Sequence, residues 1–178
     1  MDISCPTAIA VGREIAKNDL LWFEEPISAD DVEGYVEIRR ALNVRLSGAE
    51  QFRGRWAFRR MVQERVLDII QPDVCVCGGF TEFRKIAALA SANHVRVIPH
   101  MFGTSIRLAA TLHLLASLPD SPRALEPFPT LLEYDMSENA LRTELAREPI
   151  RHSDGIVEVP QGPGLGIEID RDVLRRYC

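Results

Sequence analysis

At 178 residues, with 46% hydrophobic and 26% charged side chains, the chain has the length and composition of an ordinary globular domain. Its net charge of −5, with arginines interspersed among acids, argues against binding to nucleic acid. No apolar run approaches the roughly 20 residues of a membrane span, and no signal-peptide pattern begins the chain, so we expect a cytoplasmic protein without a membrane segment. The four cysteines are expected to stay reduced, since a chain of this size needs no disulfides.

Helices and strands are expected to alternate through residue 128. Helical spacing of apolar residues predicts the helices, and short apolar runs that end at proline, glycine or acidic residues predict buried strands. The expected helices cover residues 5–18, 28 or 30–42, 55–65, 81–93 and 104–118, and the expected strands cover 20–23, 44–46, 67–70, 95–98 and 124–126. This alternation is typical of a parallel sheet with right-handed crossovers.

One acidic or histidine side chain lies at or just past the carboxyl end of each expected strand. These residues are Glu24, Glu50, Asp73, His100 and Glu126. In a (βα)8 barrel the carboxyl ends of the strands carry the active site, so the pattern predicts that all five face one mouth. Any one of them could equally cap a helix or lie in a solvated loop, and a doubly wound open sheet is the competing architecture.

The chain is too short for a closed barrel, which takes about 250 residues. We therefore expect a partial (βα)8 TIM-type barrel, equivalent to about strands 4 to 8, over residues 1–128. Residues 129–178 are expected to form a C-terminal extension that packs outside the barrel. Within this extension, residues 155–170 alternate like a hairpin and residues 171–177 form a short helix.

The chemistry of the strand ends indicates metal-assisted proton abstraction. Glu24 and Glu50, on adjacent strands, are suitable ligands for a hard cation such as Mg²⁺, although a third carboxylate would be expected. Asp73 and His100, on the next two strands, are suited to a dyad in which the carboxylate fixes the imidazole tautomer and the ring moves a proton.

Five short motifs occur in order over nearly the whole chain: WFEEP at 22–26, SGAE at 47–50, QPD at 71–73, IPH at 98–100 and PGLG at 163–166. Together they resemble the carboxyl-terminal part of the enolase superfamily, in its mandelate racemase and muconate lactonizing enzyme branch. The resemblance implies an acid-sugar dehydratase (a lyase) or a racemase (an isomerase) that removes the proton α to the carboxylate of a small substrate such as a sugar acid.

The resemblance also implies a role for each strand-end residue. Glu24 and Glu50 match two Mg²⁺ ligands, and Asp73 and His100 match the general-base dyad. Glu126 matches the carboxyl group of strand eight that hydrogen-bonds the developing oxyanion.

Three family features are expected to be missing from the polypeptide as given. The first metal ligand, an Asp, should lie before Met1, because Asp2 has too few residues before it to end a strand. The Lys-x-Lys pair is absent, since Lys17 and Lys85 are the only lysines, and so is the amino-terminal capping domain. We therefore expect little or no activity from the chain alone. The alternative is a catalytically inert half-barrel that self-associates as a homo-oligomer, or needs a partner chain, to cover its open sheet edges.

Overall fold

The chain folds into two compact units. The structure is a computed structural model that describes residues 3–118 and 129–177. Unit 1 comprises Met1–Pro72 and Val76–Ile98, and unit 2 comprises Asp73–Cys75 and Pro99–Cys178. The expected division is into two continuous segments, a barrel part (1–128) and an extension (129–178). This division stays a prediction.

Unit 1 is built on a parallel sheet with the strand order β1-β2-β3-β4. The strands are β1 (Phe23–Glu24), β2 (Leu46–Gly48), β3 (Ile69–Ile70) and β4 (Arg96–Val97). Each strand pairs in parallel with the next strand in sequence, so each connection must cross over to the starting edge of the sheet. The sequence predicts this arrangement for these four strands. The fifth expected strand, with Glu126, lies outside the described residues.

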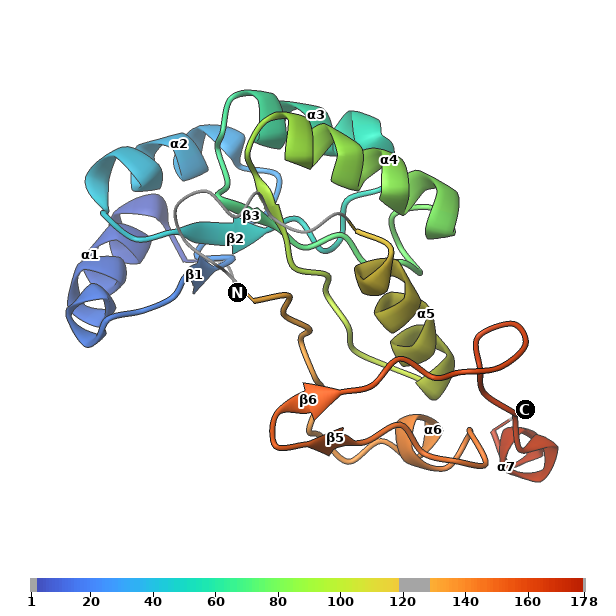
Figure 1. Cartoon of the computed structure of the whole chain (residues 1–178). Helices are drawn as coiled ribbons and strands as arrows, with labels where there is room; N and C mark the ends of the chain where they lie inside the picture. Colours follow the sequence, from blue (N-terminus) through green and yellow to red (C-terminus); the bar gives the residue numbers. More distant parts are fainter. Residues whose placement is uncertain (1–2, 119–128, 178) are drawn as a thin grey trace. The chain divides into compact units, whose positions relative to one another are not determined.

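Four helices lie on the same side of this sheet (Figure 1). They are α1 (Cys5–Ile15, continued by the 3-10 turn η1, Ala16–Asn18), α2 (Val32–Ala41), α3 (Gly54–Gln63) and α4 (Gly79–Ala92). Their apolar faces and the strands share a core of fully buried side chains that includes Tyr35, Ile38, Leu46, Phe58, Ile69, Ile70, Phe83 and Ile86. This layering is that of a barrel wall, in which a parallel sheet is covered by an outer ring of helices.

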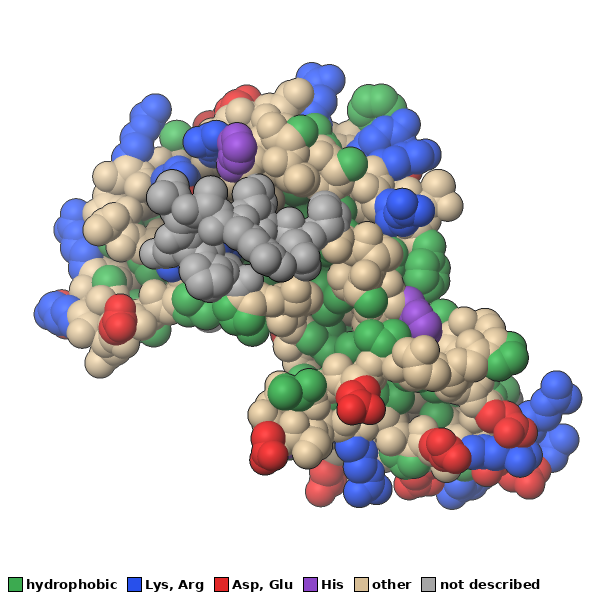
Figure 2. Space-filling model, viewed as in Figure 1, with side chains coloured by type: hydrophobic (Ala, Val, Ile, Leu, Met, Phe, Trp, Pro, Cys, Tyr) green, Lys and Arg blue, Asp and Glu red, His purple; other side chains and the backbone are tan. Residues whose placement is uncertain are grey.

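Unit 2 combines one long helix with a largely irregular segment. Its elements are α5 (Ser105–Ala116), α6 (Ala140–Thr143), β5 (His152–Ser153), β6 (Ile156–Val157) and α7 (Arg171–Arg175). Met101, Leu108 and Leu112 form its buried centre, against which Leu132, Tyr134, Ile150, Val157 and Val159 pack. Acidic and basic side chains alternate over the surface around α6 and α7 (Figure 2). In the part of the chain that the structure describes, no helix is both long and apolar enough to cross a membrane.

The hairpin expected over residues 155–170 is wrong. The structure pairs β5 with β6, so the hairpin lies at residues 152–157. Asp154 and Gly155 form its turn with φ angles of 51° and 77°, the left-handed conformation that a tight two-residue hairpin turn requires. Ile169 forms a bridge with Ala146 instead. The Asp-Gly pair was the stronger signal, and the apolar alternation after it reflects partial burial without strand pairing.

Candidate active site

Asp73 and His100, the expected dyad, contact one another within unit 2. The His100 Nδ1 atom lies 2.7 Å from Asp73 Oδ2. Ile70 of β3 is in register with Val97 of β4, and each dyad residue comes three positions after its strand residue. Because Ile70 and Val97 lie side by side, residues at the same distance after them come close together. Asp73 and His100 therefore meet.

The Asp73 carboxylate is fully buried and accepts two further hydrogen bonds. The Cys75 N–H donates to Oδ1 at 2.7 Å, while the Cys75 thiol itself is exposed. Arg107 Nη1 donates to Oδ2 at 3.1 Å. Burial raises the pKa of Asp73, but the hydrogen bonds from His100 and Cys75 and the charge of Arg107 outweigh burial and hold this pKa below its ordinary value.

An ionised Asp73 fixes the tautomer of His100. Its oxygen can only accept, so in the neutral ring Nδ1 of His100 carries the proton and Nε2 is the nitrogen with the lone pair. The His100 side chain is 17% exposed, so the ring is not completely enclosed. An imidazole oriented in this way by a carboxylate can act as a general base.

Hydrogen bonds hold the loop that carries His100 at each of its next three residues. Met101 N–H donates to Glu133 Oε2 at 3.2 Å, Arg107 Nη1 donates to the Phe102 carbonyl at 2.6 Å, and Asn139 Nδ2 donates to the Gly103 carbonyl at 3.1 Å. The loop is therefore fixed from α5 and from the segment before α6, and the imidazole is positioned through its own backbone.

Glu133 is an acidic residue beside the dyad that the pattern of strand ends did not predict. It bonds to the residue directly after His100. Glu126, the expected acid of the eighth strand, lies outside the described residues. Glu133 belongs to no strand, so a search of strand ends could not find it. Its signal was the apolar pair Leu131-Leu132 directly before it, the same pattern that precedes Glu24.

Glu24 and Glu50, the expected metal ligands, both belong to unit 1. Glu24 ends β1, is exposed, and accepts a hydrogen bond from Trp22 Nε1 at 3.0 Å. Glu50 lies two residues past β2 and is partly buried. Among the described residues, no group of three His, Cys, Asp or Glu side chains could hold a metal ion. The structure thus supplies the two predicted carboxylates at neighbouring strand ends without a third.

Glu25 binds the ends of β1 and β2 together. Its Oε1 accepts from the Ala49 N–H at 3.1 Å. A Cβ atom on Gly48 would lie 3.0 Å from the Glu25 side chain, so glycine makes this approach possible. Burial raises the pKa of Glu25, and the negative charges of Glu50 and Glu24 raise it further, although the hydrogen bond from Ala49 acts in the opposite direction. Negative charge is therefore concentrated at these two strand ends.

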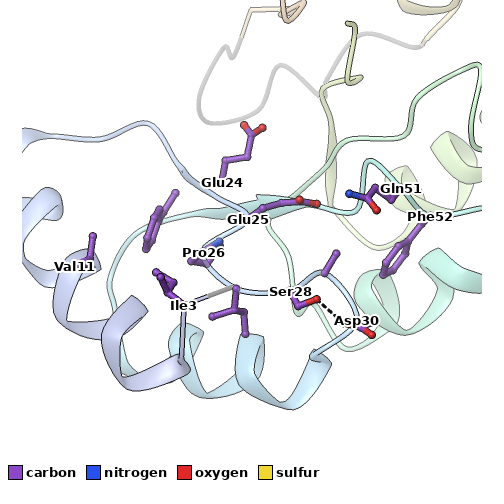
Figure 3. Close-up of a pocket in the computed structure, with 12 residues that line it drawn as sticks. Ile3, Val11, Glu24, Glu25, Pro26, Ser28, Asp30, Gln51 and Phe52 are labelled. Atoms are coloured by element: carbon purple, nitrogen blue, oxygen red, sulfur yellow. Dashed lines mark hydrogen bonds between the residues drawn. The ribbon is translucent and has the colours of Figure 1, made fainter. Parts of the chain in front are cut away.

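A cavity of about 600 Å³ lies beside β1 in unit 1 (Figure 3). Ile3, Val11 and Phe23 line its apolar part, and Glu24, Glu25 and Gln51 are among its polar residues. Glu24 and Glu25 point in different directions, with Glu25 directed toward Gln51. The cavity therefore combines a carboxylate rim with an apolar wall.

The fold and these strand-end residues define a TIM-barrel-like α/β protein. The family model described as "Enolase C-terminal domain-like" matches residues 1–173. The chain belongs to the enolase superfamily, in its mandelate racemase and muconate lactonizing enzyme branch, as the sequence motifs predict.

Several characterised proteins are similar to the chain over almost all of its length. It is 38% identical to the D-galactarolactone cycloisomerase of Agrobacterium fabrum, covering 96% of this chain and 45% of that protein. It is 33% identical to the arabinonate dehydratase of Saccharolobus solfataricus, covering 96% of this chain and 43% of that protein. The crystal structure of the 3,6-anhydro-D-galactonate cycloisomerase from Zobellia galactanivorans matches with a TM-score of 0.87 and 39% identity, covering 98% of this chain and 47% of that one. The chain thus spans less than half the length of these relatives.

Proposed function

We propose that the chain supplies the general-base dyad of an enolase-superfamily enzyme that removes the proton α to the carboxylate of a sugar acid. The observation that carries this proposal is the 2.7 Å contact between His100 Nδ1 and the buried Asp73 carboxylate. The similar dehydratase and cycloisomerases support a sugar acid as the substrate class.

In this proposal His100 Nε2 takes the α-proton, and Asp73 stabilises the imidazolium that forms. A β-hydroxyl that then leaves as water gives dehydration, and return of a proton to the opposite face gives racemisation. Glu126 keeps the proposed role of hydrogen-bonding the developing oxyanion. Glu133 is a second candidate for that role, because its carboxylate already bonds to the backbone next to His100.

Mg²⁺ is the cofactor that the family implies, and the two strand-end carboxylates are compatible with it. In the described part of the chain no lysine or arginine forms an ion pair with Glu24, and the charges of Glu24, Glu25 and Glu50 repel one another. A hard cation can bind through one or two carboxylates, with water and substrate oxygens completing its shell. Glu24 and Glu50 would hold it, and when bound it would stabilise negative charge on the substrate carboxylate.

The barrel assignment completes the proposal. We assign β1, β2, β3 and β4 to barrel strands 4 to 7, with the eighth strand at residues 124–126 and the extension at 129–178. This assignment makes Asp73 and His100 the residues that follow strands six and seven. It rests on the order of the sequence motifs and on the parallel register of the four strands.

The alternative function is that of a non-catalytic half-barrel that associates with itself or with a partner chain. One observation favours it: within the described sheet β1 pairs only with β2, and β4 only with β3. Unpaired parallel edges are rarely left open. Sedimentation at micromolar concentration tests association. A folded monomer contradicts this alternative.

The test of the proposed function is exchange of the α-proton of a panel of sugar acids in D₂O with millimolar Mg²⁺. We expect His100→Asn to reduce exchange by about 10²- to 10⁴-fold, the usual contribution of a general base. His94→Asn is the matched control, because His94 follows α4 with a φ of 59°, which Asn tolerates. Equal exchange with His100→Asn, or the absence of Mg²⁺ binding at millimolar concentration, contradicts the proposal.

A further inference from the structure

Arg107 lies at a position that helix energetics does not favour. It is the third residue of α5, whose first turn contains no acidic residue. The amino-terminal turn of a helix carries the positive end of the helix dipole and favours acidic side chains. The presence of a positively charged side chain in this turn must therefore be explained by the contacts of Arg107 and not by the helix.

The guanidinium of Arg107 bridges the two parts of the dyad. Its Nη1 donates at 3.1 Å to Asp73 Oδ2, the same oxygen that lies 2.7 Å from His100 Nδ1. Nη1 also donates at 2.6 Å to the Phe102 carbonyl, two residues after His100. A single nitrogen thus joins the carboxylate to the loop that carries the imidazole. The Arg107 side chain is 25% exposed and the Asp73 side chain is fully buried.

The backbone at Gly103 allows this path for the arginine. A Cβ atom on Gly103 would lie 3.5 to 3.6 Å from the Cδ, Nε and Cζ atoms of Arg107. The side chain therefore runs directly along Gly103, whose φ of 147° suits glycine. At the other end, Thr104 Oγ1 accepts from the Arg107 N–H and caps α5. The arginine is held along its whole length.

We propose that Arg107 is a positioning residue for the Asp73–His100 dyad: it joins the carboxylate to the His100 loop and balances the charge that faces the imidazole. The contacts alone carry the positioning role. Only its consequence for turnover rests on the proposed function.

The charge balance matters because a base must be neutral before it can accept a proton. A buried carboxylate beside a histidine stabilises the imidazolium and raises the histidine pKa. The guanidinium on the same oxygen offsets this effect, since it attracts the carboxylate and repels the imidazolium. Among the described residues, three charged groups contact His100, its carboxylate partner or its loop: Asp73 after β3, Arg107 on α5, and Glu133, which accepts from the Met101 N–H. Removing Arg107 leaves only acids in this set.

The experiment is an NMR titration of the full chain labelled at histidine Cε1, with His100 assigned from its loss in His100→Asn. We expect Arg107→Met to raise the His100 pKa by about one unit, a tenfold change in proton affinity. Arg107→Gln is the second variant, with the same expected rise, should Arg107→Met fail to fold. Arg107→Lys keeps the charge, and we expect a smaller rise.

Arg147→Met is the matched control. It removes one arginine from an exposed pair with Glu168 in the same unit, so it changes net charge equally and should leave the His100 pKa unchanged. The result that overturns the proposal is an unchanged His100 pKa. This means that Arg107→Met, or Arg107→Gln if only that variant folds, gives the same His100 pKa as the unaltered chain and Arg147→Met.

Activity gives a separate readout. Where the unaltered chain exchanges the α-proton, Arg107→Met should lower kcat at neutral pH, with little change in KM, and move the acid limb of the pH profile upward. Where the unaltered chain does not exchange the α-proton, the NMR titration alone tests the role of Arg107.

Discussion

In unit 2 the Asp73 carboxylate is fully buried and accepts hydrogen bonds from three groups, whereas in unit 1 the Glu24 carboxylate is exposed and accepts one, from Trp22. Three surface acids of unit 2, Glu144, Glu168 and Asp172, also each pair with an arginine. At the ends of β1 and β2, Glu25 lies close enough to Glu50 and Glu24 for their negative charges to raise its pKa.

This difference separates two uses of a carboxylate. A buried carboxylate stays ionised only when donors and cations compensate it, and it can then orient a neighbouring group permanently. An exposed carboxylate without a cationic partner remains available to an added cation. Substitutions of these carboxylates and addition of Mg²⁺ can each break this distinction.

The largest effect is expected from Asp73→Asn. It leaves His100 and Arg107 without their anion, and breaking such a buried pair costs about 3 kcal/mol. Glu24→Gln should change stability little, as is usual for exposed side chains. Denaturant unfolding of both variants measures the comparison. Equal losses would contradict the distinction between the two carboxylates.

The loss for Asp73→Asn should also depend on pH. The folded-state pKa of Asp73 lies below its ordinary value, so the carboxylate adds stability above about pH 4, the value in an unfolded chain. That contribution is lost as the pH falls through the folded-state pKa. The difference in the free energy of unfolding between the unaltered chain and Asp73→Asn should therefore shrink in acid. A difference that grows below pH 4 would show that the sign is wrong.

A smaller effect is expected from Mg²⁺ on unit 1. If Glu24 and Glu50 hold the ion, Mg²⁺ at ten times its Kd adds about 1.4 kcal/mol of stability. Glu24→Gln should abolish this gain, while Glu14→Gln, which alters an exposed pair between Glu14 of α1 and Lys17 of η1, should keep it. Thermal unfolding with and without Mg²⁺, followed by EDTA, makes the measurement. A gain that survives Glu24→Gln would exclude Glu24 as a ligand.

The smallest effect compares one helix cap from each unit. Asp31 caps α2 by accepting from the Gly34 N–H, and Thr104 caps α5 by accepting from the Arg107 N–H. Replacing either residue with alanine should cost about 1 kcal/mol. Only Thr104→Ala should also shift the NMR signal of His100, because it loosens the turn that carries Arg107. Equal His100 shifts in both variants would count against this coupling.

The sequence predicted the order of the elements better than their ends. The run at residues 20–23 predicts a strand, but β1 is Phe23–Glu24, and β2 likewise begins at Leu46 and not at Val44. Apolar runs report burial, whereas strand ends depend on which residues of the neighbouring strand come into register. The contact between Asp73 and His100 could be predicted, because each residue lies just past the end of a predicted strand. Arg107 could not be found in this way, because its partner lies 34 residues earlier and only its unfavourable place in the helix marks it.

The turn after Asp73 also offers a chemical handle. Cys75 contributes its N–H to the carboxylate, yet its thiol is exposed, while Cys77 is buried and Cys5 is partly buried. A maleimide dye or spin label should therefore react at Cys75 ahead of these two. Such a probe would sit two residues from the dyad without replacing any of its hydrogen-bond donors, and it could report substrate arrival in real time.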